Sequence, residues 1–142
     1  MEVSVRSICL DTNTYTALLA GQPDALAIIS SADQVWMPAP VLGELRAGFL
    51  KGRKAAANEL VLQDFLASQH VRVAHVDEAV SRRYALVFDQ LRKIGKPIPT
   101  NDLWIAACAL HVACPLYSLD RHFQIVGGIA LVQDLAQWKA IA

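Results

Sequence analysis

Charged residues are scarce in this sequence, and neither sign is in excess. Only 18% of the 142 residues are Asp, Glu, Lys or Arg, and 13 basic residues balance 13 acidic ones. Because a strongly basic body is absent, any nucleic-acid partner would have to be held by local patches. The hydrophobic content of 54% is typical of a compact protein with a substantial core. We expect residues 1–142 to form a single domain.

Cysteines and long hydrophobic runs are also few. The three cysteines, Cys9, Cys108 and Cys114, lie in apolar segments. Their odd number and setting favour reduced, buried thiols in a cytosolic protein over a disulfide framework. The longest apolar stretch, residues 103–119, contains a histidine and a proline and is too short for a comfortable membrane span. No secretory signal is evident, so we expect a soluble, cytoplasmic protein.

Short strand-like segments alternate with helical patterns along the chain. The expected strands cover residues 3–10, 35–37, 70–76, 116–119 and 129–132, and the expected helices follow Asp11 or cover residues 23–32, 40–49, 60–66, 77–94 and 102–114. This alternation predicts an α/β fold with a mostly parallel sheet and helices on both faces. In such sheets, ligands bind beyond the carboxyl ends of the strands.

The segment 102–114 is apolar on nearly every side and rich in alanine, which predicts a helix buried between other elements. Pro97 and Pro99 favour an extended connector before it, since proline disfavours helix in the preceding residue. We expect Thr100 and Asn101 to cap this helix.

Four carboxylates lie where a short apolar segment ends or a helix begins: Asp11, Glu44, Asp102 and Asp120. Asp11 and Asp120 follow expected strands, and Asp102 falls in a first helical turn, where the helix dipole favours negative charge. Glu44 lies at the rim of the buried face of its helix. If the acids meet in one cleft, their repulsion requires a cation, and oxygen ligands favour hard divalent ions such as Mg²⁺ or Mn²⁺.

Each of these acids also has an ordinary structural explanation. Asp11 and Asp102 could serve helix starts, Asp120 a turn, and Glu44 a solvated helix surface. The evidence for a metal site therefore lies in the four acids taken together. A zinc site built from Cys108, His111 and the nearby Cys114 is less favoured than core packing, because the spacing lacks a paired knuckle. His122 could approach a substrate, but a turn histidine is more often structural, and we leave it outside the catalytic set.

The residues around the acids resemble the ordered motifs of PIN-domain proteins. The matching segments are Leu10-Asp11-Thr12-Asn13, Val41-Leu42-Gly43-Glu44-Leu45, Asn101-Asp102-Leu103-Trp104-Ile105-Ala106-Ala107 and Ser118-Leu119-Asp120-Arg121-His122-Phe123. Their order and intervals look most like VapC-type toxins of bacterial and archaeal toxin–antitoxin pairs, including FitB-like relatives. Ser118 stands where threonine is commoner, which keeps the hydroxyl.

This resemblance implies a PIN-like three-layer α/β/α sandwich and an endoribonuclease that depends on Mg²⁺ or Mn²⁺ and hydrolyses RNA by metal-activated water. In that interpretation, the four acids ligate the metal directly or through water. Asn13 and Ser118 would support them through hydrogen bonds. The resemblance further implies a cognate VapB-type antitoxin that covers the cleft, and a homodimer. No Gly-rich phosphate loop or convincing Ser-His-Asp triad competes with this interpretation.

Two runs of basic residues could contact RNA phosphates. The first comprises Arg46, Lys51, Arg53 and Lys54, and the second comprises Arg92, Lys93 and Lys96. Since neither run has interleaved aromatic residues, a solvated helix surface explains them equally well. Apolar residues between Leu60 and Leu66 could receive an antitoxin or a second subunit, but core burial explains them too.

Two other functions remain open from the sequence. A PIN-fold scaffold without catalysis gives no reason to keep four mutually repelling acids. A structure-specific DNA nuclease would use the same chemistry, and only the geometry of its substrate would differ.

Overall fold

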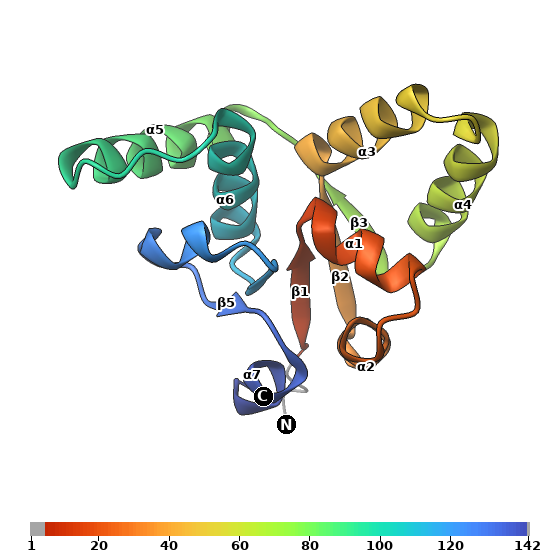
Figure 1. Ribbon diagram of the computed structural model, residues 1–142. Helices are drawn as coiled ribbons and strands as arrows, with labels where there is room; N and C mark the ends of the chain where they lie inside the picture. Colours follow the sequence, from red (N-terminus) through yellow and green to blue (C-terminus); the bar gives the residue numbers. More distant parts are fainter. Residues whose placement is uncertain (1–4, 142) are drawn as a thin grey trace.

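A five-stranded, all-parallel sheet organises the structure, a computed structural model that describes residues 5–141 (Figure 1). The strands are β1 (Ser7–Leu10), β2 (Gln34–Pro38), β3 (Val71–Ala74), β4 (Leu116–Tyr117) and β5 (Leu131–Val132). Their order across the sheet is β3-β2-β1-β4-β5. The register aligns Ile8 with Val35 on one side of β1 and Cys9 with Leu116 on the other. The expected parallel sheet is confirmed.

Seven α-helices and one 3₁₀ helix cover the sheet within the described range. They are α1 (Thr12–Leu19), α2 (Pro23–Ser31), α3 (Ala39–Lys51), α4 (Ala55–Ala67), α5 (Glu78–Lys93), α6 (Thr100–Val112), η1 (Arg121–Ile125) and α7 (Leu135–Ala140). The chain steps one way from β1 to β3 and the other way to β4 and β5, so right-handed crossovers place α1–α4 and α5–α6 on opposite faces. Figure 1 shows α3 and α4 to one side of β1, and α5 and α6 to the other. This is the expected three-layer α/β/α architecture.

The central strand β1 is covered on both faces. Ile8, Cys9 and Leu10 have no exposed surface, although successive side chains of a strand point to opposite faces. Continuous burial of this kind is typical of parallel sheets between helix layers. Helix α6 is buried as expected, because its residues from Ile105 to Ala109 all lie in the core.

The start of α6 differs from the expectation. Thr100 is already its first helical residue, and the N-cap is Pro99, whose extended backbone has ψ 150° and which makes no side-chain capping bond. Thr100 and Asn101 therefore do not cap the helix. The reason is that the fixed φ of a proline suits the residue before a first turn, so the helix begins earlier than the polar residues suggested.

Strands β3, β4 and β5 are shorter than the apolar patterns predict, β2 is longer by one residue at each end, and the α-helix α7 and the 3₁₀ helix η1 are not among the expected helices. Residues 3 and 4 of the first expected strand lie outside the described residues. Helix α7 begins after Asp134, whose carboxylate accepts a hydrogen bond from the Gln137 amide at 2.8 Å. It packs on α2, where the Trp138 indole donates to the Ser31 hydroxyl at 2.8 Å, and the Arg6 guanidinium lies 4.1 Å from the Trp138 ring centroid. Six residues are too few to show helical periodicity.

None of the helices between residues 5 and 141 is sufficiently long and apolar to span a bilayer.

The strand order reverses between β1 and β4. From β1 the chain continues to β2 and β3 on one side of the sheet, whereas β4 and β5 lie on the other. The helical connections leave this point in opposite directions, which opens a crevice at the carboxyl ends of the two strands. Asp11 follows β1 directly, and Ser118 follows β4 directly. The topology therefore predicts a ligand site where these two residues meet.

Helix α6 ends in a strained residue, which provides a test of the fold. Ala113, the exposed C-cap, has φ 55° and ψ 44°, a left-handed conformation that costs energy for any residue with a Cβ. Ala113→Gly should raise the free energy of unfolding by about 1 kcal/mol, after the greater entropy of an unfolded glycine is allowed for. Chemical denaturation measures the change. Ala47→Gly, in the exposed interior of α3, is the matched control and should lower stability by about 1 kcal/mol.

Candidate functional site

Asp11 is the most buried acid of the candidate site. It is the N-cap of α1, and its side chain is held by three donors although only 5% of the residue is exposed. The Thr12 amide donates to Oδ1 at 2.7 Å, the Ser118 hydroxyl to Oδ2 at 2.6 Å, and the Asn13 amide group to Oδ2 at 3.4 Å. The capping role expected as the ordinary explanation is present. It coexists with contacts that reach across to β4.

Ser118 and Asn13 connect the ends of β1 and β4. The fully buried Ser118 hydroxyl donates to Asp11 and accepts from the Asp120 backbone amide at 3.0 Å. The side-chain oxygen Oδ1 of Asn13 accepts from the Leu119 backbone amide at 3.1 Å. These bonds fix Asp11 and Asp120 relative to one another. Ser118 and Asn13 therefore contact the residues that they are expected to support.

Glu44 reaches the site from the second turn of α3. Its Oε2 accepts a hydrogen bond of 2.7 Å from the Thr12 hydroxyl, and its side chain is only partly exposed. Thr12 thus joins two acids, because its backbone amide holds Asp11 and its hydroxyl holds Glu44. Thr12 is not among the residues that the sequence predicts to support the acids. Its position beside Asp11 indicates that it lies near the site, but its contact with Glu44, 32 residues away, cannot be derived from the sequence.

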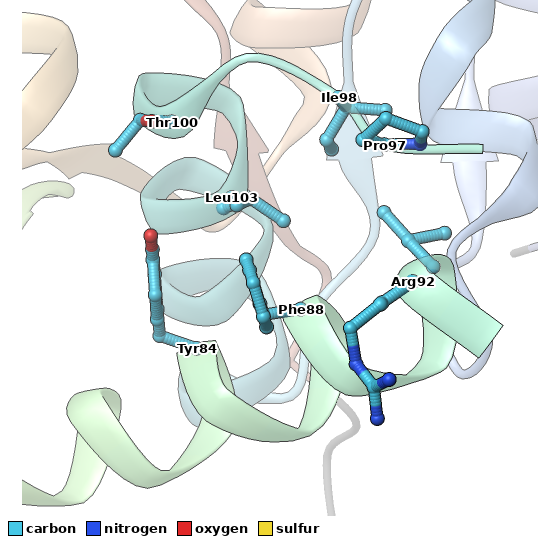
Figure 2. A pocket seen from close by; sticks show the side chains of 8 residues that line it. Tyr84, Phe88, Arg92, Pro97, Ile98, Thr100 and Leu103 are labelled. Carbon is cyan, nitrogen blue, oxygen red and sulfur yellow. The ribbon is translucent and has the colours of Figure 1, made fainter. Parts of the chain in front are cut away.

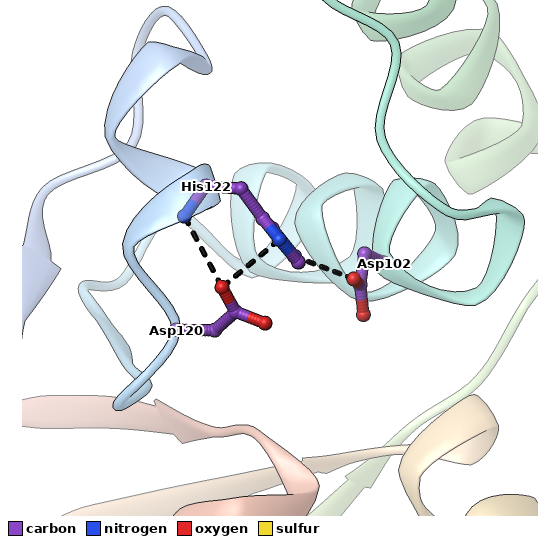
Figure 3. Close-up of side chains that lie close together, drawn as sticks. All are labelled: Asp102, Asp120 and His122. Carbon is purple, nitrogen blue, oxygen red and sulfur yellow. Dashed lines mark hydrogen bonds and ion pairs between the residues drawn. The ribbon is translucent and has the colours of Figure 1, made fainter.

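Asp102 and Asp120 meet at the imidazole of His122 (Figure 3). Asp102 is the third residue of α6, and its Oδ2 lies 2.5 Å from His122 Nε2. Asp120 caps η1, and its Oδ1 lies 2.9 Å from His122 Nδ1. One ligand atom from each of the three side chains lies within 4.8 Å of the others. The site therefore contains His122, which sequence analysis left outside the catalytic set.

His122 reaches the acids because of the 3₁₀ geometry of η1. The His122 amide donates to Asp120 Oδ1 at 3.2 Å and closes a tight turn after Asp120. This turn directs the His122 side chain toward Asp102 of α6. The signal available in the sequence was only the short spacing between Asp120 and His122.

The four acids influence one another electrostatically. Burial raises the pKa of Asp11, the Ser118 and Thr12 donors oppose this, and the charges of Glu44 and Asp120 raise it further. Burial is also the main cause that raises the pKa of Asp102. The His122 side chain opposes that shift, whereas the Asp11 and Glu44 charges add to it. The acids expected to meet in one cleft are therefore brought together.

These residues fit a divalent cation. Among residues 5–141, no lysine or arginine forms an ion pair with any of the four acids, and His122 is the only basic side chain that contacts them. Clustered, partly buried carboxylates are costly without a compensating positive charge. Their oxygens are the donors that Mg²⁺ and Mn²⁺ prefer. The donor set therefore suits a metal better than an ordinary ion-pair network.

The residues of the first basic run, Arg46, Lys51, Arg53 and Lys54, are not all available to contact RNA. Arg46 forms a two-pronged ion pair with Glu59, with distances of 2.7 and 3.1 Å. Lys51, Arg53 and Lys54 are exposed around the end of α3. Lys51 is seven residues beyond Glu44, roughly 10 Å along the helix axis. In the second run, Arg92 and Lys93 both pair with Asp89.

Cys108 belongs to the core rather than to a zinc site. It has no exposed surface, and burial raises the pKa of its thiol to about 11. The Asp102–Asp120–His122 group is the metal-competent cluster found within the described part of the chain, and it includes no cysteine.

A separate apolar pocket lies between α5, the connector before α6, and α6 itself (Figure 2). Its volume is about 270 Å³, and it is lined by Tyr84, Phe88, Leu91, Arg92, Pro97, Ile98, Thr100 and Leu103. None of the four acids lines it. The pocket is therefore distinct from the candidate site.

Comparisons with known proteins agree with the geometry. A family model described as PIN domain matches residues 8–129. Ribonuclease VapC4 of Mycobacterium tuberculosis is 30% identical over 135 residues, covering 92% of this chain and 98% of that protein. The structure of VapBC-1 from nontypeable Haemophilus influenzae is similar with a TM-score of 0.78 and 26% identity, over 92% of this chain and 98% of that chain. FitAcB from Neisseria gonorrhoeae gives a TM-score of 0.68 and 25% identity, over 89% and 96%.

Neutralising Asp102 should reveal the cost of the clustered charges. A carboxyl whose pKa is raised in the folded state stabilises the protein below its unfolded pKa of about 4, and this contribution is lost as pH rises through the folded pKa. Metal-free wild type should therefore lose stability relative to Asp102→Asn as pH increases from about 4 to 7. Calorimetric melting in chelator measures the difference in Tm. Asp64→Asn, which neutralises an exposed acid on α4, is the control. If the difference in Tm between wild type and Asp102→Asn stayed constant with pH, the expectation would be contradicted.

Proposed function

The chain belongs to the PIN-domain family, and from this we propose that it is a divalent-metal-dependent endoribonuclease, the toxin of a VapBC-type toxin–antitoxin pair. The observation that carries the proposal is the gathering of Asp11, Glu44, Asp102 and Asp120 without a lysine or arginine partner among the described residues. Relatives matching most of the chain are named ribonucleases. We further propose that residues 1–142 form one PIN domain.

The four acids would hold Mg²⁺ or Mn²⁺. When bound, such an ion neutralises developing negative charge on a phosphodiester and lowers the pKa of a coordinated water. The protein's contribution is to fix the acids in advance. Asp11 is oriented by Ser118 and Asn13, and Glu44 by Thr12, so little rearrangement of these side chains is needed when substrate arrives.

The supporting bonds also decide which oxygens remain free. Asp11 Oδ2 accepts from both Ser118 and Asn13, whereas Oδ1 accepts only from Thr12 and keeps a second lone pair. Glu44 uses only Oε2 in its bond to Thr12, so Oε1 stays available. The hydrogen bonds therefore orient the acids while leaving donor atoms for a cation.

RNA is the proposed substrate, and exposed basic residues would contact its phosphates. Lys51, Arg53 and Lys54 are exposed near the end of α3, the same helix that carries Glu44. Arg46 was part of this run in the sequence interpretation. Its charge is already matched by Glu59, so we retain only the other three residues in the proposal.

A VapB-type antitoxin and a second copy of the chain are the proposed partners. A solved relative, VapBC-5 from Mycobacterium tuberculosis, is a member of the VapBC family of toxin–antitoxin systems, which supports the first. The apolar residues of α4 contribute less to such a surface than expected. Leu62 is fully buried, and Phe65 packs edge-on against Tyr15 with ring centroids 5.4 Å apart, whereas Leu60 remains 64% exposed.

The decisive test is cleavage of total cellular RNA by the purified protein. Wild type should cut RNA with Mg²⁺ or Mn²⁺ and lose activity in chelator, and mapped fragment ends should show internal cleavage. Combined Asp11→Asn and Asp102→Asn should reduce the rate at least about 100-fold, because two metal-holding charges are removed. Asp64→Asn should retain wild-type activity. Cleavage that is indifferent to chelator, or equal in the double variant, would falsify the metal-nuclease proposal.

The toxin role is tested separately in cells. Induced expression in a bacterial host should arrest growth, and Asp102→Asn should relieve the arrest at equal protein level. Co-expression of a small protein encoded by the neighbouring gene should restore growth. That small protein should co-purify with this chain. Growth arrest that persists in the acid variant would count against a nuclease as its cause, and normal growth with wild type would count against the toxin role.

A further inference from the structure

His122 occupies the position between two of the proposed metal-holding acids. Its ring nitrogens face the Asp120 carboxylate at 2.9 Å and the Asp102 carboxylate at 2.5 Å, and both acids come from different elements (Figure 3). The side chain is 31% exposed, so it lies at the boundary between the site and solvent. A histidine here brings a nitrogen donor into a centre whose other donors are oxygens.

The two ring nitrogens are not equivalent. Nδ1 lies at hydrogen-bond distance from Asp120 Oδ1, which also accepts from the His122 backbone amide. Nε2 is buried and, within residues 5–141, has no hydrogen-bond partner of acceptable geometry, although Asp102 Oδ2 is close. A nitrogen held this close to a carboxylate oxygen needs a positive charge beside it, either a proton on the ring or a cation shared by the three side chains, whose ligand atoms lie within 4.8 Å of one another.

This arrangement matches the usual setting of a metal-bound histidine. Such a residue typically donates one ring N–H to a carboxylate, which fixes the tautomer and leaves the other nitrogen as the ligand. Asp120 is placed to accept from Nδ1, and Nε2 then faces the same space as Asp102. The neighbouring Phe123 ring, with its centroid 5.0 Å from that of His122, further restricts the imidazole.

We propose that His122 is a nitrogen ligand of the metal centre, through Nε2, and that it shifts the centre's preference from Mg²⁺ toward first-row transition ions such as Mn²⁺. The inference rests on the proposed metal-dependent function. Mg²⁺ favours oxygen ligands and retains water, whereas imidazole suits transition ions better.

A purely structural role for His122 gives different expectations. If the imidazole only spaced Asp102 and Asp120, its removal would weaken binding of Mg²⁺ and Mn²⁺ by similar factors. A ligand role predicts unequal loss and a direct magnetic coupling between bound Mn²⁺ and a histidine nitrogen. Metal binding, rather than activity, therefore separates the two roles.

The experiment uses the full chain, freed of metal and titrated with Mn²⁺ or Mg²⁺ in a calorimeter. His122→Ala should raise the Mn²⁺ dissociation constant by about 10-fold or more and the Mg²⁺ constant by less than about 3-fold. Pulsed electron paramagnetic resonance of bound Mn²⁺ should show ¹⁴N coupling in wild type and none in the variant. His111→Ala, an exposed histidine toward the far end of α6, is the matched control and should behave as wild type. His122→Gln replaces the alanine variant if that protein does not fold.

The outcomes distinguish this inference from the function on which it rests. Wild type that binds Mn²⁺ without ¹⁴N coupling, or equal weakening of both ions in His122→Ala, overturns the histidine ligand alone. Wild type that binds neither ion, or binding unaffected by Asp102→Asn with Asp120→Asn, overturns the metal centre and the proposed function together. Selective loss of Mn²⁺ affinity with loss of ¹⁴N coupling supports the proposal.

Discussion

The repulsion among partly buried carboxylates is the constraint on which the site depends. Asp11 is almost completely buried, and the charges of Glu44 and Asp120 add to the cost of ionising it. The protein offsets part of that cost with hydrogen bonds from Ser118 and Thr12. It supplies no lysine or arginine partner among the residues described, so the arrangement keeps an unmet demand for positive charge. Such a demand lowers stability, and costs of this kind are typical of functional sites.

Three of the four acids lie at the starts of helices, and only Glu44 lies inside one. Asp11 stands between β1 and α1, Asp102 in the first turn of α6, and Asp120 before η1. The free amide groups of a helix start favour negative charge at the first two of these positions. Because β1 and β4 are neighbours at the reversal of strand order, the ends that carry these acids converge without a long loop. Architecture and electrostatics thus favour the same edge of the sheet.

The sequence predicted the parallel sheet, the buried α6 and the convergence of the acids, because these follow from local periodicity and from the edge where parallel strands end. It did not predict the bond between Thr12 and Glu44 or the pairing of Arg46 with Glu59, since both depend on side-chain geometry across helices. The sequence leaves His122 outside the set of acids, because a turn histidine is more often structural and a five-residue 3₁₀ helix has no recognisable pattern that would place its side chain. Local signals identified the backbone positions, whereas the contacts required three-dimensional packing.

The packing of α7 has a practical consequence for work with this protein. Arg6, just before β1, donates to the Trp138 carbonyl oxygen at 3.2 Å and stacks on the Trp138 ring, so the first and last described segments are held together. They meet at the amino ends of the strands, whereas the acids lie beyond the carboxyl ends (Figure 1). A tether joined to the described residues at Arg6 or at Ile141 therefore starts from the edge of the sheet opposite to the acids, and the acidic edge stays open to large ligands.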